Sequence, residues 1–491
     1  MAELPIDPLS KEFDWEGFGT DGFEDFKQAQ WLAIKMGGTW RYDHTAKRWH
    51  HWDKHRWAPD RTGQVRQVAA RLASRGAIAA QNEVERKALM RLMTVAAIDK
   101  ALEALASFPE YGTDGADWDQ DPFLLGCKNG IVDLRTNTLD TTPSPTCLVT
   151  KTTGQTFVPL TLKTGDRFQE KFAERAPKFM EFINQITSED LSMVNFLLLW
   201  FGASMFGFSP EQRFLLMTGI GRNGKGVLKH SVMKAAGEYG CQPDANVYMR
   251  SKLGGARSDG ARADLMDLKG KRIGFFSEPE GNRFNEEMLK AHTGGDLITA
   301  RALYSNSVIS WEPTHSITFL VNNAPEVEDL GPSMTARTMV ADFRERYDGD
   351  KEDKGLNQKL DKEAAGVLAI LCWAASAWYE SWNESGVGLT LPPRVIEQSK
   401  AFMERNDAIA AVINDAMVVD HTAQTRSSLL YETYLQWHAR SDRSDEAMGQ
   451  NRFSQALERK GFKRVKRMDG AYVIGLKPKS ALRLAEEEED D

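Results

Sequence analysis

Residues 214–227 read FLLMTGIGRNGKGV, an apolar run followed by a turn that contains four glycines. An apolar run that ends in such a turn is typical of a buried strand. Residues 227–233 then have the apolar spacing of a helix. A strand, a glycine-rich turn and a helix form the scaffold of a phosphate-binding loop, in which backbone N–H groups and the helix N-terminus face an anion.

The spacing of glycine and lysine in this turn fits the Walker A pattern, with one departure. Lys225 stands at the position of the phosphate-contacting lysine, but Gly226 stands where a Ser or Thr would offer its hydroxyl to Mg²⁺. The alternative is a glycine-rich turn with an incidental lysine, which the flanking strand and helix disfavour. The expected nucleotide-binding residues are Gly219, Ile220, Gly221, Arg222, Asn223, Gly224, Lys225, Gly226 and Val227.

The composition is that of an ordinary globular protein with several domains. Its 491 residues predict roughly three domains at about 150 residues each. The net charge is −8, but the acidic tail at 486–491 supplies six of those charges, so the rest is near neutral. Contact with nucleic acid must therefore depend on local basic patches.

Neither cysteine usage nor hydropathy indicates secretion or a membrane. The four cysteines are far apart and include no Cys-x-x-Cys pair, which disfavours a zinc ribbon and a disulfide framework. The N-terminus lacks the features of a signal peptide, and the apolar run at 196–201 is too short for a membrane helix. We expect a cytoplasmic protein with no membrane partner.

The N-terminal part predicts a mixture of strands and helices. Aromatic residues in short alternating runs between 40 and 57 indicate a small antiparallel sheet. Helices are expected at about 61–74 and 83–106, followed by a hairpin with a bend at Asn129-Gly130.

Two groups of residues in this part are interpreted as structural. Four histidines between 44 and 55 have no recognised zinc spacing, so they are expected on the polar faces of the sheet. Asp119 and Asp121 resemble the carboxylate pair of a primase or polymerase, but their neighbours favour a role as turn formers.

Two further buried strands end in polar side chains that suit nucleotide chemistry. The strand at 272–277 leads into Glu278 and Glu280, and a carboxylate there can hold Mg²⁺ through water or orient the attacking water. The strand at 316–321 ends in Asn322, whose amide can sense the γ-phosphate. Arg337 precedes another strand and is either a surface residue or an arginine finger that reaches a neighbour's ATP.

The order of these elements resembles superfamily III helicases, in particular the poxvirus-type branch found in phage and plasmid primase–helicase proteins. The most specific part reads Lys-x-x-Thr-Gly-Gly-Asp-x-Ile-x-x-Arg at 290–301 and continues as Trp-Glu-Pro-Thr at 311–314. The resemblance extends over roughly residues 20–478.

The resemblance implies a ring, expected to be a hexamer, that uses ATP and Mg²⁺ to move 3′ to 5′ along one DNA strand. Lys225 would hold the β- and γ-phosphates. Glu278 would be the Walker B acid, holding Mg²⁺ through water, with Glu280 as a second candidate. Asn322 would be the sensor and Arg337 the finger that acts on the neighbouring subunit.

A DNA-gripping hairpin in the central channel is also implied, between Arg301 and His315, with Arg301, Tyr304 and His315 as DNA contacts. Gly226 leaves Mg²⁺ without the usual hydroxyl, so the alternative is an inactive ATPase. Too few residues precede the helicase-associated segment for a primase domain, so we expect no primer synthesis by this chain alone. A separate primase or replication initiator would then be a partner.

The C-terminal part predicts a helix from Ser427 with a serine cap, a second helix at about 450–460 and a hairpin around Asp469-Gly470. This order suggests a winged helix. A basic cluster suited to phosphate contact lies in it, formed by Lys460, Lys463, Arg464, Lys466 and Arg467. The alternative is a solvated wing that packs on the ring.

The expected fold is a multidomain α/β protein with a P-loop, AAA+-like ATPase core. Its expected parts are an α+β N-terminal domain (1–165), a helical collar (166–208), the core (209–350), a helical segment and linker (351–425), a winged helix (426–480) and an acidic disordered tail (481–491).

Three functions are compatible with these patterns. The leading hypothesis is an ATP-dependent replicative DNA helicase of a phage or mobile genetic element, acting on single-stranded and forked DNA in the host cytoplasm. The second is a replication scaffold or initiator that binds ATP and DNA without turnover. The third is a P-loop small-molecule kinase, which the 293–296 element and the winged helix disfavour.

Overall fold

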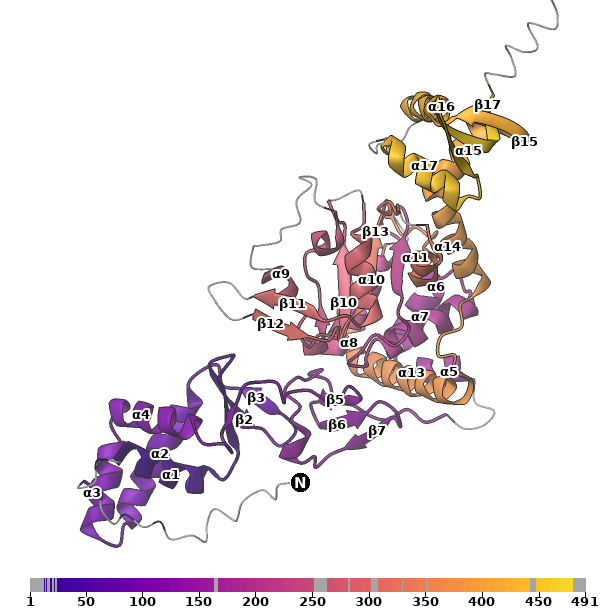
Figure 1. Cartoon of the computed structure of the whole chain (residues 1–491). Coiled ribbons are helices and arrows are strands. Elements are labelled where there is room, and N and C mark those ends of the chain that lie inside the picture. Colours follow the sequence, from indigo (N-terminus) through magenta and orange to yellow (C-terminus); the bar gives the residue numbers. More distant parts are fainter. Residues whose placement is uncertain are drawn as a thin grey trace, which may run out of the picture.

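The computed structural model describes residues 13, 15, 18, 19, 22, 24–162, 167–250, 263–280, 283–301, 308–328, 330–349, 352–441 and 447–479. Tyr304 and the acidic tail lie outside this set. In Figure 1 the N-terminal helices lie at one end of the molecule, the large parallel sheet in the middle, and the last helices and strands at the other end. Across the described ranges, no helix is long and apolar enough to cross a bilayer.

The N-terminal part packs four helices against a small sheet of order β3-β2-β1-β4. The first three strands pair antiparallel, as predicted, and the short β4 pairs parallel with β1. The single helix predicted over 83–106 is wrong, because Thr94 divides it and caps the second half by accepting the Ala97 N–H at 3.3 Å. The elements are α1 (Glu24–Met36), β1 (Trp40–Asp43), β2 (Arg48–Trp52), β3 (Trp57–Pro59), α2 (Gln64–Ala79), α3 (Glu83–Leu92), α4 (Val95–Ala106) and β4 (Gly112–Thr113).

A second antiparallel sheet, β5-β6-β7, follows at Leu124–Cys127, Gly130–Asp133 and Thr138–Asp140. The predicted hairpin is present, but its two-residue loop is Lys128-Asn129, because Cys127 pairs directly with Gly130. Gly130 has a φ of 151°, and a Cβ there would lie 2.1 Å from the carbonyl oxygen of Asp140. Glycine at this position is therefore required by the close approach of β7.

This second sheet shares its core with the central part. Leu125, Val132 and Leu134 are buried in one cluster with side chains of the helices that follow. A short 3-10 turn at Pro145–Cys147 links the sheet to those helices, which are α5 (Phe168–Arg175), α6 (Pro177–Ile186) and α7 (Leu191–Ala203). The domain boundary predicted at residue 165 stays a prediction, and the apolar core extends across it.

The central sheet is parallel and five-stranded, in the order β14-β8-β13-β10-β9. β8 (Phe214–Thr218) is the predicted strand before the glycine-rich turn, and α8 (Lys225–Ala236) is the predicted helix after it. The other strands are β9 (Gly240–Cys241), β10 (Ile273–Ser277), β13 (Ser316–Val321) and β14 (Thr338–Asp342).

Alternating side chains of the sheet enter two separate cores. Leu215 and Met217 of β8 pack with α7, α8 and the long α13 (Ala364–Ser385), while Phe214 and Leu216 pack on the other face. The strand is therefore apolar on both faces, as expected for a parallel sheet covered by helices on each side. Other described elements of the central part are two short 3-10 turns (Gly237–Tyr239 and Ala245–Tyr248), α9 (Ala263–Met266), α10 (Glu286–Gly294), α11 (Pro332–Arg337), α12 (Leu356–Asp361) and α14 (Pro393–Asn406).

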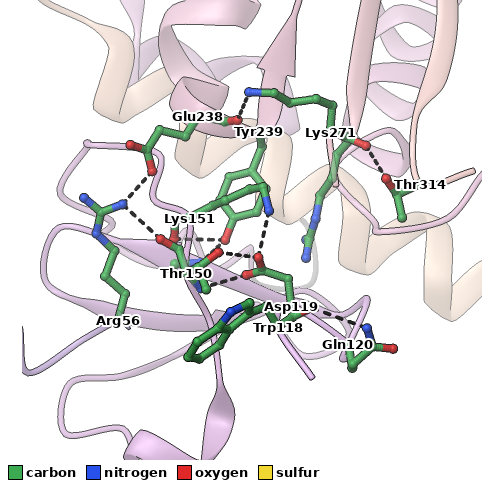
Figure 2. A network of polar contacts seen from close by, with 12 residues as sticks. Arg56, Trp118, Asp119, Gln120, Thr150, Lys151, Glu238, Tyr239, Lys271 and Thr314 are labelled. Atoms are coloured by element: carbon green, nitrogen blue, oxygen red, sulfur yellow. Dashed lines mark hydrogen bonds and ion pairs between the residues drawn. The ribbon is translucent and has the colours of Figure 1, made fainter. Parts of the chain in front are cut away.

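A network of polar contacts anchors the edge of the sheet at which its strands begin, as Figure 2 shows. Glu238 lies just before β9, and its carboxylate accepts a hydrogen bond of 2.5 Å from Arg56. Its backbone carbonyl oxygen accepts a hydrogen bond of 2.7 Å from the side chain of Lys271, which lies just before β10. Lys151 donates to the Asp119 carboxylate at 2.7 Å. Burial raises the pKa of Asp119, but the charge and hydrogen bond of Lys151 and two hydrogen bonds from Thr150 together lower it below its usual value. Asp119 is therefore a charged structural residue, consistent with the interpretation that it is not catalytic.

Arg272 completes this joint from inside the protein. It is 3% exposed and donates to the carbonyl oxygens of Met205 and Leu124 at 2.8 and 2.7 Å. Its guanidinium also lies over the Tyr239 ring, 4.6 Å from the centroid. The β5-β6-β7 sheet, the segment that follows α7 and the start of β10 are thereby held together.

The C-terminal part contains a three-stranded sheet of order β15-β17-β16 and three helices. The predicted hairpin is confirmed, with its loop at Met468-Asp469 because Arg467 pairs with Gly470. The predicted serine cap is wrong, since Arg426 is the N-cap and the Ser427 hydroxyl lies inside the domain, 3.1 Å from that of Ser454. The elements are α15 (Ala408–Ala416), β15 (Met417–Arg426), α16 (Ser427–Arg440), α17 (Gln450–Arg459), β16 (Arg464–Arg467) and β17 (Gly470–Pro478).

Candidate active site

The loop between β8 and α8 has a backbone that requires glycine. Gly219, Gly221 and Gly224 have φ values of 147°, 49° and 86°. A Cβ at Gly224 would lie 2.4 Å from a methyl carbon of Ile186. Positive φ angles and this close packing hold the loop against α6. The loop ends at the N-terminus of the 12-residue α8.

Lys225 is held by groups at the mouth of this loop. Its side chain points inward, with the residue 5% exposed, and Nζ donates to the Gly219 carbonyl oxygen at 2.6 Å. Nζ also lies 3.4 Å from Oδ1 of Asn322, which accepts the Gly221 N–H at 3.1 Å. One amide oxygen therefore links the predicted sensor to both the backbone and the lysine of the loop.

The strand order explains how Asn322 reaches the loop. β13 lies directly beside β8, with Val321 opposite Thr218, so the residues that follow both strands emerge together. β10, which leads to Glu278, lies beside β13 on its other side, with Ser277 opposite Leu320. The order in the sheet, which differs from the order in the chain, brings three predicted residues to one edge.

Two carboxylates act on the charge of Lys225. Burial lowers the pKa of Lys225, whereas Glu278 and Asp342 raise it, and burial prevails. Glu278 is exposed and has a φ of 45°, and its N–H donates to the Leu320 carbonyl oxygen at 3.0 Å. Its carboxylate is therefore available to solvent and ligands beside the loop. Glu280 is also exposed, and its N–H donates to Asn246 at 3.0 Å.

Asp342 was missed by the sequence analysis. It is the last residue of β14, and it lies opposite Thr218 on the other side of β8 from Asn322. Its N–H donates to the side chain of Gln398 in α14 at 2.8 Å. The signal was present, because an acid at the end of a buried strand is the same pattern that identified Glu278.

Gly226 is exposed, and a Cβ built on it would meet no atom within 4 Å. Packing therefore does not explain the absence of Ser or Thr at this position. Gly226 is the second residue of α8, and a larger side chain at this position would face open space.

The residues of this edge fit a magnesium nucleotide. Backbone N–H groups of the loop, the α8 N-terminus and Lys225 suit the phosphates, and the Glu278 carboxylate is a ligand of the type that Mg²⁺ prefers. Mg²⁺ bound there would supply positive charge that offsets the negative charge of the phosphate oxygens. Among the described residues, no group of three or more His, Cys, Asp or Glu could hold a metal on its own.

Arg337 does not join this cluster within one chain. It is the last residue of α11, directly before β14, so the length of that strand, about 16 Å, separates it from the loop edge. Its guanidinium donates to the Ser333 carbonyl and hydroxyl oxygens at 3.1 and 2.7 Å.

The predicted DNA contacts of the central part have three different outcomes. Arg301 ends β11 (Ile298–Arg301), which pairs antiparallel with β12 (Val308–Trp311), and Figure 1 shows both strands projecting from the body of the central part. Tyr304 lies outside the described residues. His315 is 1% exposed, so the structure does not support the prediction that it contacts DNA.

His315 instead belongs to a buried polar cluster. The Tyr248 hydroxyl lies 2.8 Å from Nδ1 of His292 and 2.9 Å from Nε2 of His315. Burial and, to a smaller extent, the nearby His292 together lower the pKa of His315 to about 3. A neutral His315 therefore contributes to the core.

The basic residues of the C-terminal hairpin remain on the surface. Lys463, Arg464, Lys466 and Arg467 are all exposed. Lys460 differs, because its ammonium pairs with the carboxylate of Asp407. The four hairpin residues thus present positive charge to solvent.

Comparison with known proteins agrees with the motifs. Residues 29–188 match the family described as "D5 N terminal like". A protein of Acanthamoeba polyphaga mimivirus named "Putative helicase L207/L206" is 24% identical over 340 residues. The predicted helicase resemblance is confirmed.

The match to the mimivirus protein covers 65% of this chain and 33% of the relative, so the chain spans about one third of that protein. Two solved structures of the NrS-1 C terminal region, both in the apo form, also match this chain. They have TM-scores of 0.48 and 0.47 and identities of 12% and 11%, and each match covers 92% of this chain and 99% of the other.

Proposed function

We propose that this chain is the motor of an ATP-dependent replicative DNA helicase from a phage or mobile element. The observation that carries the proposal is the convergence of Lys225, Asn322 and Glu278 at one edge of the parallel sheet. A phosphate-binding loop, an amide and a carboxylate in this arrangement suit hydrolysis of a nucleoside triphosphate.

In this mechanism Lys225 exchanges its bond with Gly219 for bonds to the β- and γ-phosphates. Asn322, which already accepts the Gly221 N–H, would then report the state of the γ-phosphate to β13. Glu278 would orient the attacking water or bind Mg²⁺ through water. Gly226 offers no hydroxyl, so water would complete the metal's ligands.

The same geometry supports a site shared between subunits. Arg337 lies at the opposite edge of the sheet from its own loop, so it can complete only the site of a neighbour. A ring, expected to be a hexamer, would bring the two together, and the β11–β12 hairpin would then contact the translocating strand.

The C-terminal part has the order α15-β15-α16-α17-β16-β17, which suits the winged helix predicted for it. We assign its exposed hairpin residues, including Lys463 and Arg467, to contacts with DNA phosphate.

Release of inorganic phosphate with and without single-stranded DNA, combined with displacement of a strand from forked DNA, tests the proposal. DNA-stimulated hydrolysis and ATP-dependent displacement are expected. Folded protein that releases no phosphate in the presence of Mg²⁺ and DNA would overturn it.

One observation favours a second function, a replication scaffold that binds ATP and DNA without turnover. Gly226 removes the side-chain ligand for Mg²⁺ from the loop. Tight ATP binding with no hydrolysis under any DNA condition would select this alternative.

A further inference from the structure

A large cleft separates the motor from the C-terminal part. It has a volume of about 1680 Å³, and it is lined on the motor side by the start of the nucleotide loop, Thr218 to Ile220, and by Asn322. The opposite wall is formed mainly by α17, which Figure 1 shows on the side of the C-terminal part that faces the motor. The nucleotide edge and α17 therefore share one space.

α17 presents two chemically different faces. Phe453 and Leu457 are fully buried in the core of the C-terminal part. The opposite face is exposed and carries amide and guanidinium groups that all line the cleft: Asn451, Arg452, Gln455 and Arg459. Glu458 is exposed as well, but it does not line the cleft.

These four side chains suit the edges of DNA bases. Arginine can bond both acceptors of guanine in the major groove, and asparagine or glutamine can bond adenine in the same bidentate manner. A ten-residue helix fits that groove. Single strands have no major groove, so this face suits double-stranded DNA specifically.

The motor places a carboxylate against this face. Glu328 accepts bonds of 2.7 and 2.6 Å from Arg250 and Arg283, and Arg452 of α17 lies 3.7 Å from the same carboxylate. Glu286 and Glu326 also line this wall. The Arg452 side chain is 67% exposed, and ion pairs of such exposure are weak.

The connection between the two parts is short. α14 ends at Asn406 and α15 begins at Ala408, so Asp407 alone joins them. Asp407 caps α15 by accepting the Ala410 N–H at 2.9 Å, and it pairs with Lys460 at the end of α17. A rotation at this single residue would move α17 relative to Glu328.

We propose that the polar face of α17 is a binding surface for double-stranded DNA, and that Glu328 of the motor competes with the duplex for Arg452. The proposal rests on the DNA-binding role proposed for the C-terminal part. Arg452 cannot bond Glu328 and a base at once. Duplex binding therefore separates α17 from the motor and opens the cleft beside the nucleotide loop.

This is tested by measuring how tightly the full chain binds a fluorescent mixed-sequence duplex and a single strand of equal length. Glu328→Gln should tighten duplex binding about two- to fivefold, the range set by a weak exposed pair, and leave single-strand binding unchanged. Arg452→Ala should weaken duplex binding about tenfold or more, alone or combined with Glu328→Gln. Glu458→Gln is the matched control, because it removes the same charge from α17 outside the cleft.

Equal effects of Glu328→Gln and Glu458→Gln would overturn the competition, and unchanged duplex binding by Arg452→Ala would overturn the site. Thermal unfolding of each variant excludes loss of the fold as the cause. If α17 variants leave duplex binding unchanged while DNA-stimulated ATP hydrolysis is present, this inference fails and the proposed helicase does not. If hydrolysis is absent, the helicase fails and the duplex measurements still decide the role of α17.

Discussion

The ammonium of Lys225 donates a 2.6 Å hydrogen bond to the carbonyl oxygen of Gly219, six residues earlier in the same loop. The lysine is thus held at the loop mouth by the backbone and by Asn322, and in the proposed helicase a triphosphate would replace these partners. Four predictions follow from this edge of the sheet and from the core behind it.

Lys225→Ala should abolish DNA-stimulated ATP hydrolysis, because it removes the ammonium that lies against Gly219 and Asn322 at the mouth of the loop. Phosphate release measured with saturating single-stranded DNA checks this. Lys229→Ala is the control, since Lys229 lies one turn further along α8 and pairs with Gln242 at 2.9 Å. Full activity in Lys225→Ala, or equal loss in both variants, would contradict the assigned role.

Gly226→Ser should strengthen the dependence of ATP binding on Mg²⁺, because the added hydroxyl enters open space at the usual position of the metal ligand. We expect the Mg²⁺ concentration for half-maximal ATP binding to fall about tenfold. Calorimetric titration of ATP at several Mg²⁺ concentrations measures this without depending on turnover.

Gly226→Ala adds the same Cβ without a hydroxyl, so it should behave like the native chain. A gain in the alanine variant equal to that of the serine variant would show that helix propensity, rather than metal binding, is responsible.

Mixing Arg337→Ala subunits with Lys225→Ala subunits should restore part of the ATP hydrolysis that each lacks alone. Mixed rings contain sites in which an intact loop faces an intact arginine. Phosphate release measured across mixing ratios checks this, with a maximum expected at intermediate ratios. Full activity of Arg337→Ala on its own would show that Arg337 is a surface residue.

Acid should destabilise the protein partly through His315. Its pKa is about 3 in the fold and 6.5 without burial, so the unfolded state binds more protons between these values. The contribution of His315 to the free energy of unfolding is therefore fully present above about pH 6.5. It falls by about 1.4 kcal/mol per pH unit as the pH drops toward 3. Urea unfolding at pH 7, 6 and 5 measures this slope.

His315→Gln keeps a group at the position of Nε2 but cannot titrate, so it should reduce the slope. His421→Gln, an exposed histidine in β15, should not change it. An unchanged slope in His315→Gln would mean that other groups cause the acid sensitivity.

The amino-acid sequence by itself determined the local elements of the central part. The apolar run, four glycines and Lys225 at 214–227 specify a strand, a loop and a helix, because backbone conformation and burial pattern act over a few residues. The same reasoning found Glu278 and Asn322 at strand ends, and the hairpin of the C-terminal part.

Only the tertiary structure decided which of these residues meet. The strand order placed Asn322 beside Lys225, added Asp342 from β14 and left Arg337 at the far edge, since pairing between strands depends on contacts distant in the chain. It also buried His315 against Tyr248 and turned the polar face of α17 toward Glu328. Local patterns carry no information on such contacts, because burial of a polar side chain depends on the partners that the whole fold brings to it.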